Sequence, residues 1–217
     1  MSHAGLWCNA CDASLPYLNA PRCAICALPT LQGEVCGHCL SDPPAFTRTT
    51  AVFSYSFPLD KLVQAMKFGE QLALAHAFAQ KIAKHITPDN LPDCVIAMPL
   101  HPARLKERGF NQSHLLASKL AHELNITLLP HACQRVRDTP AQSSLKWKER
   151  DKNVRDAFRC NVDLTGKRIA LVDDVMTTGA SLDALAKPSK NQAQRKFILG
   201  LWRVHCRILA KAKIPLA

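Results

Sequence analysis

The sequence contains no apolar run that approaches the roughly 20 residues required of a membrane-spanning helix. Its start, MSHAGLWCNACDAS, lacks the basic segment and the apolar segment of an export signal, so we expect a cytoplasmic protein without membrane insertion. Charged residues make up only 21% of the chain against 47% apolar residues, a balance that is ordinary for a folded domain and excludes disorder over most of the length.

Acidic residues are absent from one end of the chain. Residues 187–217 include eight Lys and Arg residues and no Asp or Glu, whereas the rest of the chain has 20 basic and 17 acidic residues. The formal net charge of +11 is therefore mainly a property of this basic tail. A nucleic-acid-binding function inferred from overall charge would depend on the tail alone.

The chain has ten cysteines, and without an export signal they favour metal binding over disulfides. Six of them form three CxxC pairs, separated by eleven and then nine residues. Two such pairs complete the tetrahedral thiolate site that Zn²⁺ prefers. We predict a structural zinc ribbon within residues 1–45, whose ligands are Cys23, Cys26, Cys36 and Cys39.

The first pair, Cys8 and Cys11, remains outside this site. It could bind a second ion with His38 or with a partner chain, exchange into the first site, or stay as free thiols. A redox dithiol is less favoured because residues 1–45 lack the βαβ context that usually accompanies one. The other cysteines occur singly and are predicted to be small core residues, namely Cys94, Cys133, Cys160 and Cys206.

The stretch VDDVMTTGAS at residues 172–181 is the most informative motif. Residues 169–172 are typical of a strand buried in a parallel sheet, and Asp173 and Asp174 follow where such a strand leaves the sheet. A helix over 182–187, begun by Gly179 or Ser181, would present backbone N–H groups to a phosphate. The carboxylates repel a phosphate, so we expect them to bind sugar hydroxyls or the waters of Mg²⁺. Simple helix capping is the alternative, but it needs only one such residue.

The intervening sequence predicts alternating strands and helices. Strands are expected over residues 50–56 and 94–98, and helical spacing is found at 59–66, over 72–86 and after residue 112. Gln112 or Ser113 is expected to cap the last of these helices. Lys67 is assigned to solvent by default, although it could reach a site. The loop PLHPAR, followed by RGFNQ, indicates a second anion site through its basic residues Arg104, Lys106 and Arg108.

Residues 135–155 carry seven basic and three acidic residues around a Pro and paired Ser. We predict a loop and short helix that close over a ligand and exclude water from it. A solvated surface segment is the alternative.

Taken in order, these motifs resemble the ComF/GntX family of phosphoribosyltransferase-like proteins linked to DNA uptake, over roughly residues 5–186. VDDVMTTGAS is similar to the signature of type I phosphoribosyltransferases, which bind phosphoribosyl pyrophosphate (PRPP). The resemblance implies an α/β fold with a mostly parallel sheet and flanking helices over residues 46–217, behind the small zinc ribbon. Many relatives have four CxxC pairs and two zinc ions, whereas this chain has three pairs. The tail after Ala186 departs from the family, although Phe197–Trp202 could still supply the last strand.

The resemblance also implies roles for individual residues. Asp173 and Asp174 would bind the ribose hydroxyls, the turn would bind the 5-phosphate, and the loop after the second strand would bind pyrophosphate. The turn comprises Met176, Thr177, Thr178, Gly179, Ala180 and Ser181, and the loop residues are Leu100, His101 and Arg104. Asp173, Asp174 and Arg104 would serve catalysis. A lid or acceptor loop would include Arg108, Asn111, Gln112, Arg135, Arg137, Gln142 and Asn153.

The function implied is Mg²⁺-dependent transfer of a phosphoribosyl group to an acceptor that the sequence does not identify. One alternative is a non-catalytic protein that senses PRPP or binds single-stranded DNA within the DNA-uptake machinery. A second is a DNA-binding protein that acts through its zinc ribbon and basic tail. A third is a chain inactivated by its altered end.

Overall fold

The computed structural model describes residues 6–68, 71–139, 153–187 and 195–203. The helices are α1 (Asn9–Ala13), α2 (Gly37–Ser41), α3 (Leu59–Lys67), α4 (Ala73–Ala83), α5 (Pro102–Arg108), α6 (Gln112–Leu124) and α8 (Ala180–Ala186), with a 3-10 turn at Pro88–Asn90. The strands are β1 (Arg48–Ser54), β2 (Cys94–Ala97), β3 (Thr127–Leu128), β4 (Cys133–Arg135), β5 (Phe158–Cys160), β6 (Arg168–Met176) and β7 (Arg195–Arg203).

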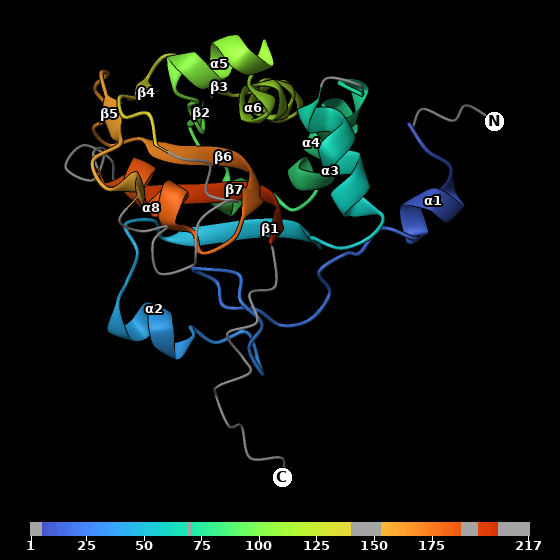
Figure 1. The fold of residues 1–217 in the computed structure, drawn as a ribbon. Helices are drawn as coiled ribbons and strands as arrows, with labels where there is room; N and C mark the ends of the chain where they lie inside the picture. The colour runs from blue at the N-terminus through green and yellow to red at the C-terminus, as the bar shows by residue number, and fades with distance from the viewer. Residues whose placement is uncertain (1–5, 69–70, 140–152, 188–194, 204–217) are drawn as a thin grey trace.

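A five-stranded sheet organises the molecule, in the order β1-β7-β6-β2-β3, and every pair in it is parallel (Figure 1). The four residues of β2 are all buried, as are Ile169–Val172 in β6. Such strands need apolar side chains on both faces because helices cover both sides of a parallel sheet. The predicted α/β fold class, with its mostly parallel sheet and N-terminal cysteine ribbon, is confirmed.

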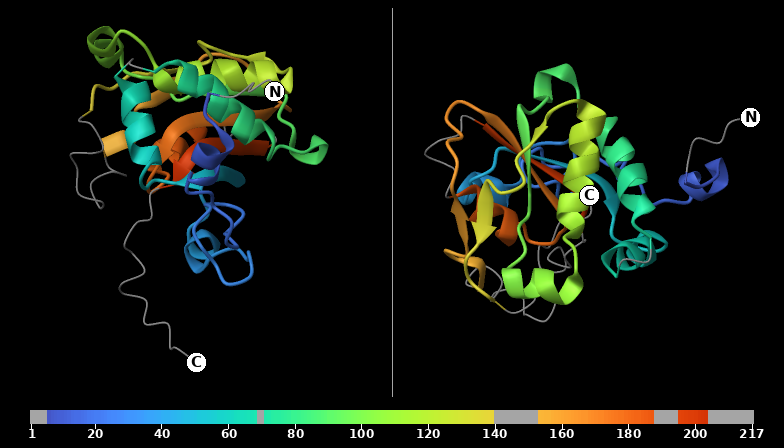
Figure 2. Two further views of the ribbon diagram at one scale, coloured as in Figure 1. Left: turned by 90° about the vertical axis from the view of Figure 1, so that its right-hand side faces the viewer. Right: turned by 90° about the horizontal axis from the view of Figure 1, so that it is seen from above.

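Two hydrophobic cores lie on opposite faces of this sheet. Helices α3, α4 and α6 pack in the first core, against Val95 of β2 and Ala170 of β6, and α4 and α6 run side by side in Figure 2. Helix α8 and the antiparallel pair β4–β5 pack in the second core, against Ile96 and Leu171. Consecutive residues of β2 and β6 thus point into different cores, as the two-residue period of a strand requires.

The element at residues 102–108 differs from expectation, because α5 forms where a loop was expected. Pro102 occupies its first turn, the ring of His101 accepts a hydrogen bond from the N–H of Ala103, and Gly109 ends it at φ +76°. Proline at the start and glycine after the end are favourable helix boundaries. The cap of α6 also differs: the side chain of Asn111, and not of Gln112 or Ser113, accepts its first N–H groups.

The atypical end of the chain still contributes to the sheet. Strand β7 pairs with both β1 and β6, as the apolar run Phe197–Trp202 suggested, and α8 ends at Ala186, just before Pro188. The rest of the basic tail, residues 188–194 and 204–217, lies outside the described residues.

The N-terminal 45 residues divide between two parts of the structure. The ring of Trp7 packs at a tilt against Phe78 of α4, and that of Tyr17 packs likewise against Phe53 of β1. The first segment therefore packs on the main core. Helix α2 and the cysteine ribbon lie on the other side of the sheet from α6 (Figure 1). No helix among the described residues is both long and apolar enough to cross a membrane.

The single cysteines show one correction. Cys94 is buried in β2 as predicted, but Cys133 and Cys160 lie opposite each other in β4 and β5 and form a disulfide. Their separation of 27 residues hides this pairing from a search for closely spaced cysteines. Cys206 lies outside the described residues.

Candidate functional site

The acid pair lies within β6, which continues to Met176 instead of ending before the carboxylates. Asp174 is only 6% exposed, and Asp173 is partly buried. The Asp173 carboxylate accepts hydrogen bonds from the hydroxyl of Ser113 (3.0 Å) and from the N–H of Asp174 (2.9 Å). These contacts fix the pair against the start of α6.

The environment of Asp173 disfavours its charged form. Burial, and then the neighbouring charge of Asp174, raise the pKa of Asp173 to about 7, although the Ser113 hydroxyl and the charge of Lys67 act in the opposite direction. A carboxylate with this pKa exchanges its proton near neutral pH. A hydroxyl donor or a cation at this carboxylate would favour its charged form.

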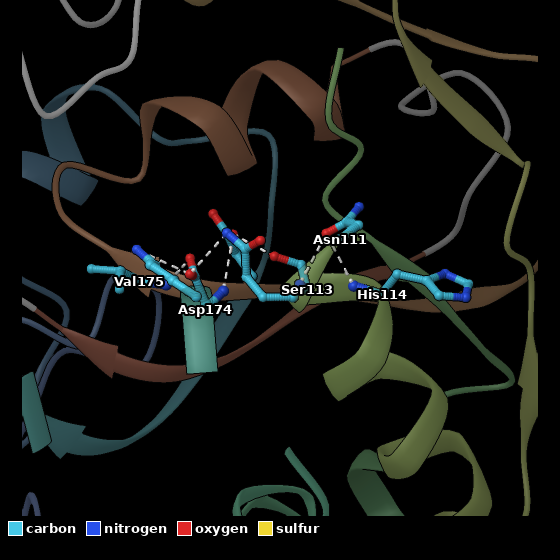
Figure 3. A network of polar contacts seen from close by, with 8 residues as sticks. Asn111, Ser113, His114, Asp174 and Val175 are labelled. Atoms are coloured by element: carbon cyan, nitrogen blue, oxygen red, sulfur yellow. Dashed lines mark hydrogen bonds and ion pairs between the residues drawn. The ribbon is translucent and has the colours of Figure 1, made fainter. Parts of the chain in front are cut away.

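Asp174 is held by three donors. Its Oδ1 accepts from the N–H of Val175 (2.7 Å), and its Oδ2 accepts from Nε2 of Gln112 (3.3 Å) and forms an ion pair with Nζ of Lys67 (3.1 Å). Figure 3 shows this network beside the α6 start, where Asn111 accepts from the N–H groups of Ser113 and His114. The amide of Asn111 also donates to the carbonyl of Met98, which joins α6 to the end of β2.

A cavity of about 470 Å³ opens at this edge of the sheet. The structure brings thirteen of the predicted site residues to its wall. They are Leu100, His101, Arg104, Arg108, Gln112, Arg135, Asp173, Asp174, Met176, Thr177, Gly179, Ala180 and Ser181. The acidic strand end, the hydroxyl-bearing turn and the basic segment after β2 therefore face one space, because the carboxyl ends of parallel strands lie at the same edge.

Arg135 of β4 supplies a cation without a carboxylate partner among the described ion pairs. Burial lowers the pKa of its guanidinium, its Nε has no hydrogen-bond partner in the described structure, and a second nitrogen donates to Thr139. The charges of Asp138 and Asp173 act against this lowering, and the guanidinium lies 5.7 Å from the centre of the Phe158 ring. Its open Nε can still donate to an anionic ligand. Arg104 instead forms an ion pair with Glu107 at 2.8 Å. Both side chains are exposed, so this ion pair contributes little stabilisation and Arg104 can leave it for a ligand.

The turn after β6 depends on one glycine. Gly179 has φ +87°, and a Cβ at this position would lie 2.8 Å from Cε of Met176 and 3.6 Å from the ring of Phe46. Met176 and Phe46 thus pack closely against the turn, which also lines the cavity. Glycine is required both for the backbone conformation and for the space.

Four predicted site residues lie away from the cavity wall. Thr178 lines a second cavity, and its hydroxyl accepts from the N–H of Ala180. Asn111 caps α6, Arg137 donates to the carbonyl of Arg155, and Asn153 is helical and precedes β5 in the chain. Gln142 and most of the predicted lid, residues 140–152, lie outside the described residues.

Two residues at the acid pair are placed differently from expectation. Lys67, assigned to solvent by default with a site position as the alternative, lines the cavity and pairs with Asp174. Ser113, considered as a cap, donates to Asp173. Lys67 ends the helix that follows β1, whose carboxyl end points to the same edge of the sheet. That position is the one signal that could have identified it.

The second and third CxxC pairs together have the geometry of a metal site. The Sγ atoms of Cys23, Cys26, Cys36 and Cys39 all lie within 4.8 Å of one another, and those of Cys26 and Cys36 are 3.6 Å apart. A tetrahedral Zn²⁺ with bonds of about 2.3 Å would separate its sulfurs by about 3.8 Å, so the four residues fit this ion. Burial raises the pKa of Cys23, but N–H groups of Cys26, Cys36 and Ile25 outweigh it and bring the pKa to about 7.

Cys8 and Cys11 do not take part in this cluster. Both are exposed on the segment that packs against α4, and His38 lies instead at a second cavity, beside the ribbon. Among the described residues, the four-cysteine cluster is the one group with metal-ligand geometry.

The end of the ribbon contacts α8, the helix that follows the turn. The N–H of Ala45 donates to Asp183 of α8 (2.6 Å), and Phe46, 4% exposed, packs beneath Gly179. The N–H and hydroxyl of Thr49 donate to the carbonyls of Ala24 and Ile25 in the first CxxC turn of the cluster. The ribbon is therefore joined to α8 through Ala45, and the adjoining Phe46 packs against the turn.

Comparison with known proteins agrees with this architecture. Residues 1–40 match the family model of the double zinc ribbon domain. The DNA utilization protein YhgH of Salmonella typhimurium is 34% identical over 194 residues, which span 86% of this chain and 85% of that protein. Competence protein F of Haemophilus influenzae is 32% identical over 83% of this chain and 82% of its own length.

A zinc-ribbon protein with an α/β domain is thus defined by sequence and fold together. The chain belongs to the ComF family of DNA utilization and competence proteins. A purine phosphoribosyltransferase from Pyrococcus horikoshii aligns at 19% identity over 61% of this chain and 82% of that chain, with a TM-score of 0.35, which is too low to bear on function.

Proposed function

We propose that this chain is a cytoplasmic PRPP-binding protein of the DNA-uptake pathway that transfers the phosphoribosyl group to an acceptor and releases pyrophosphate. The zinc ribbon, residues 1–45, would support the phosphoribosyltransferase-like domain, residues 46–217. One observation carries the proposal. A single cavity is lined by an acid pair, a hydroxyl-bearing turn and several cations from three different parts of the chain.

Each part of the cavity fits one part of PRPP. Asp173 and Asp174 accept hydrogen bonds, so they would bind the two ribose hydroxyls, and residues 176–181 would bind the 5-phosphate. Leu100, His101 and Arg104, with Arg135, whose Nε has no hydrogen-bond partner in the described structure, would bind the pyrophosphate. The carboxylates also suit the waters of Mg²⁺, and the bound ion would neutralise charge on the departing pyrophosphate.

The reaction would break the bond between the anomeric carbon and pyrophosphate, which leaves with the electron pair, and form a bond from the acceptor to that carbon. The cations at Arg104 and Arg135 would stabilise the developing charge of pyrophosphate. The acid pair would hold the ribose ring in place while positive charge develops on it. Residues 135–155 would exclude water from the reacting carbon.

Calorimetric titration with PRPP and Mg²⁺ tests the binding. Asp174→Asn removes one anionic acceptor and should weaken PRPP binding about tenfold or more, since a hydrogen bond to a charged group contributes about 1.5 to 3 kcal/mol. Asp89→Asn makes the same change at an exposed position outside the cavity and should have no effect. If the unmodified protein bound no PRPP, the proposal would be wrong.

The second candidate function is a non-catalytic module that binds PRPP or single-stranded DNA. The names of the relatives, a DNA utilization protein and a competence protein, favour a role beside DNA. Release of pyrophosphate from PRPP is measured in the presence of nucleobases, amines or single-stranded DNA. Release that depends on one acceptor supports the transferase, whereas binding without release supports the module.

A further inference from the structure

The side chain of Asp174 has little hydrogen-bonding capacity left for a ligand. Each carboxylate oxygen has about two acceptor sites. Oδ2 already accepts from Nε2 of Gln112 (3.3 Å) and contacts Nζ of Lys67 (3.1 Å), while Oδ1 accepts from the N–H of Val175 (2.7 Å). Oδ1 keeps one open acceptor site, so a second sugar hydroxyl can bind, at Oδ2, only if one of the two donors there moves away.

Lys67 is the donor that can leave. Gln112 is the first residue of α6 and is 5% exposed, so its side chain is enclosed by packing. The side chain of Lys67 is 27% exposed, comes from the last turn of α3 and lines the cavity. A flexible four-carbon chain allows its ammonium group to move within the cavity.

We propose that Lys67 is a ligand-binding residue of this cavity. It holds Asp174 in the unliganded protein, and it moves to a phosphate oxygen of the pyrophosphate group when the sugar hydroxyls replace it on Asp174. This inference rests on the proposed PRPP binding. An ammonium group released inside a partly enclosed cavity needs an anion, and PRPP is the source of that anion.

The arrangement of the elements favours the pyrophosphate over the 5-phosphate as this anion. The turn that would bind the 5-phosphate leads into α8, which packs in the second core. Lys67 belongs to α3, which packs in the first core, on the opposite face of the sheet. The acid pair of β6 lies between the two. Lys67 and the turn therefore lie on opposite sides of the acid pair. If the turn binds the 5-phosphate, Lys67 can bind the pyrophosphate.

Calorimetry with two ligands tests the proposal. Lys67→Met keeps the length of the side chain and removes its charge. We expect PRPP with Mg²⁺ to bind about tenfold or more weakly to this variant. Ribose 5-phosphate, which has the hydroxyls and the 5-phosphate but no pyrophosphate, should bind as well as before or more tightly, because Lys67 no longer competes for Asp174.

Lys61→Met is the matched control, since Lys61 is exposed on the same helix and does not line the cavity. It should leave both affinities unchanged. Lys67→Arg keeps the charge and should retain most of the PRPP affinity, and thermal unfolding of each variant checks that it is folded. If Lys67→Met is not folded, Lys67→Gln removes the same charge with a polar side chain and is titrated in its place.

The outcomes separate the inference from the proposed function. If Lys67→Met lost affinity equally for PRPP and for ribose 5-phosphate, Lys67 would only position the acid pair, and the inference would be wrong. An unchanged PRPP affinity in Lys67→Met would also overturn it. So would a loss of PRPP affinity in Lys67→Arg as large as in Lys67→Met. Failure of the unmodified protein to bind PRPP would instead reject the proposed function itself.

Discussion

Substitution of Gly179 by alanine tests how the turn is built. The φ of +87° is left-handed, and adopting it costs an alanine about 1 to 2 kcal/mol. The new Cβ would also lie 2.8 Å from Cε of Met176, which is 2% exposed and has little room to yield. Because this atom ends a flexible side chain, we expect overpacking near the lower end of its usual range, about 1 kcal/mol. The free energy of unfolding should therefore fall by about 2 to 3 kcal/mol.

Urea denaturation of Gly179→Ala beside Gly166→Ala separates the two terms. Gly166 has φ +71° with no atom within 4 Å of the added Cβ, so it reports the backbone strain alone and should lose about 1 to 2 kcal/mol. Gly179→Ala should also bind PRPP more weakly, while Gly166→Ala should not. Equal destabilisation by both substitutions would refute the packing argument, and full PRPP affinity in Gly179→Ala would refute the role given to the turn.

The α6 cap, the acid pair and the ribbon each provide a further test. Asn111→Ala removes the cap of α6 and should lower the free energy of unfolding by about 1 to 2 kcal/mol in urea titration; a loss below about 0.3 kcal/mol would contradict the capping role. The pKa of Asp173 is raised to about 7, whereas its ordinary value is near 4. Between these two pH values the folded state therefore binds more protons than the unfolded state. In buffer free of divalent metals, the free energy of unfolding should fall as pH rises from about 4 to about 7. Asp173→Asn should flatten this dependence, and an unchanged slope would show that another group causes it. Chelation should release one zinc ion per chain from the four-cysteine cluster, measured with a metal indicator. Cys23→Ser should abolish that zinc and Cys8→Ser should retain it, whereas loss in both would place Cys8 in the site.

The strands and helices that lead to the site were predictable because their side chains repeat with a local period. The apolar run 169–172 is the continuously buried stretch of β6, and the helical spacing at 59–66 lies in α3. The four-cysteine cluster also followed from spacing, since each CxxC pair is a local turn. Helix α5 was missed because it is short and exposed, so no apolar face marks it.

Contacts between distant residues were not predictable in this way. Gln112 and Asp174 are 62 residues apart, and Ala45 and Asp183 are 138 residues apart. The disulfide partners Cys133 and Cys160 are equally unmarked. Such pairs depend on the order of strands in the sheet and on which face each helix covers.

The sequence by itself determined the chemical groups of the site, because strand end, carboxylates and turn are consecutive residues whose geometry is local. Only the tertiary structure decided which groups meet them. Lys67 reaches Asp174 because β1 and β6 belong to one sheet with their carboxyl ends at one edge, and Phe46 lies beneath Gly179 because the ribbon packs against α8. Packing across the sheet joins segments that no short-range pattern relates.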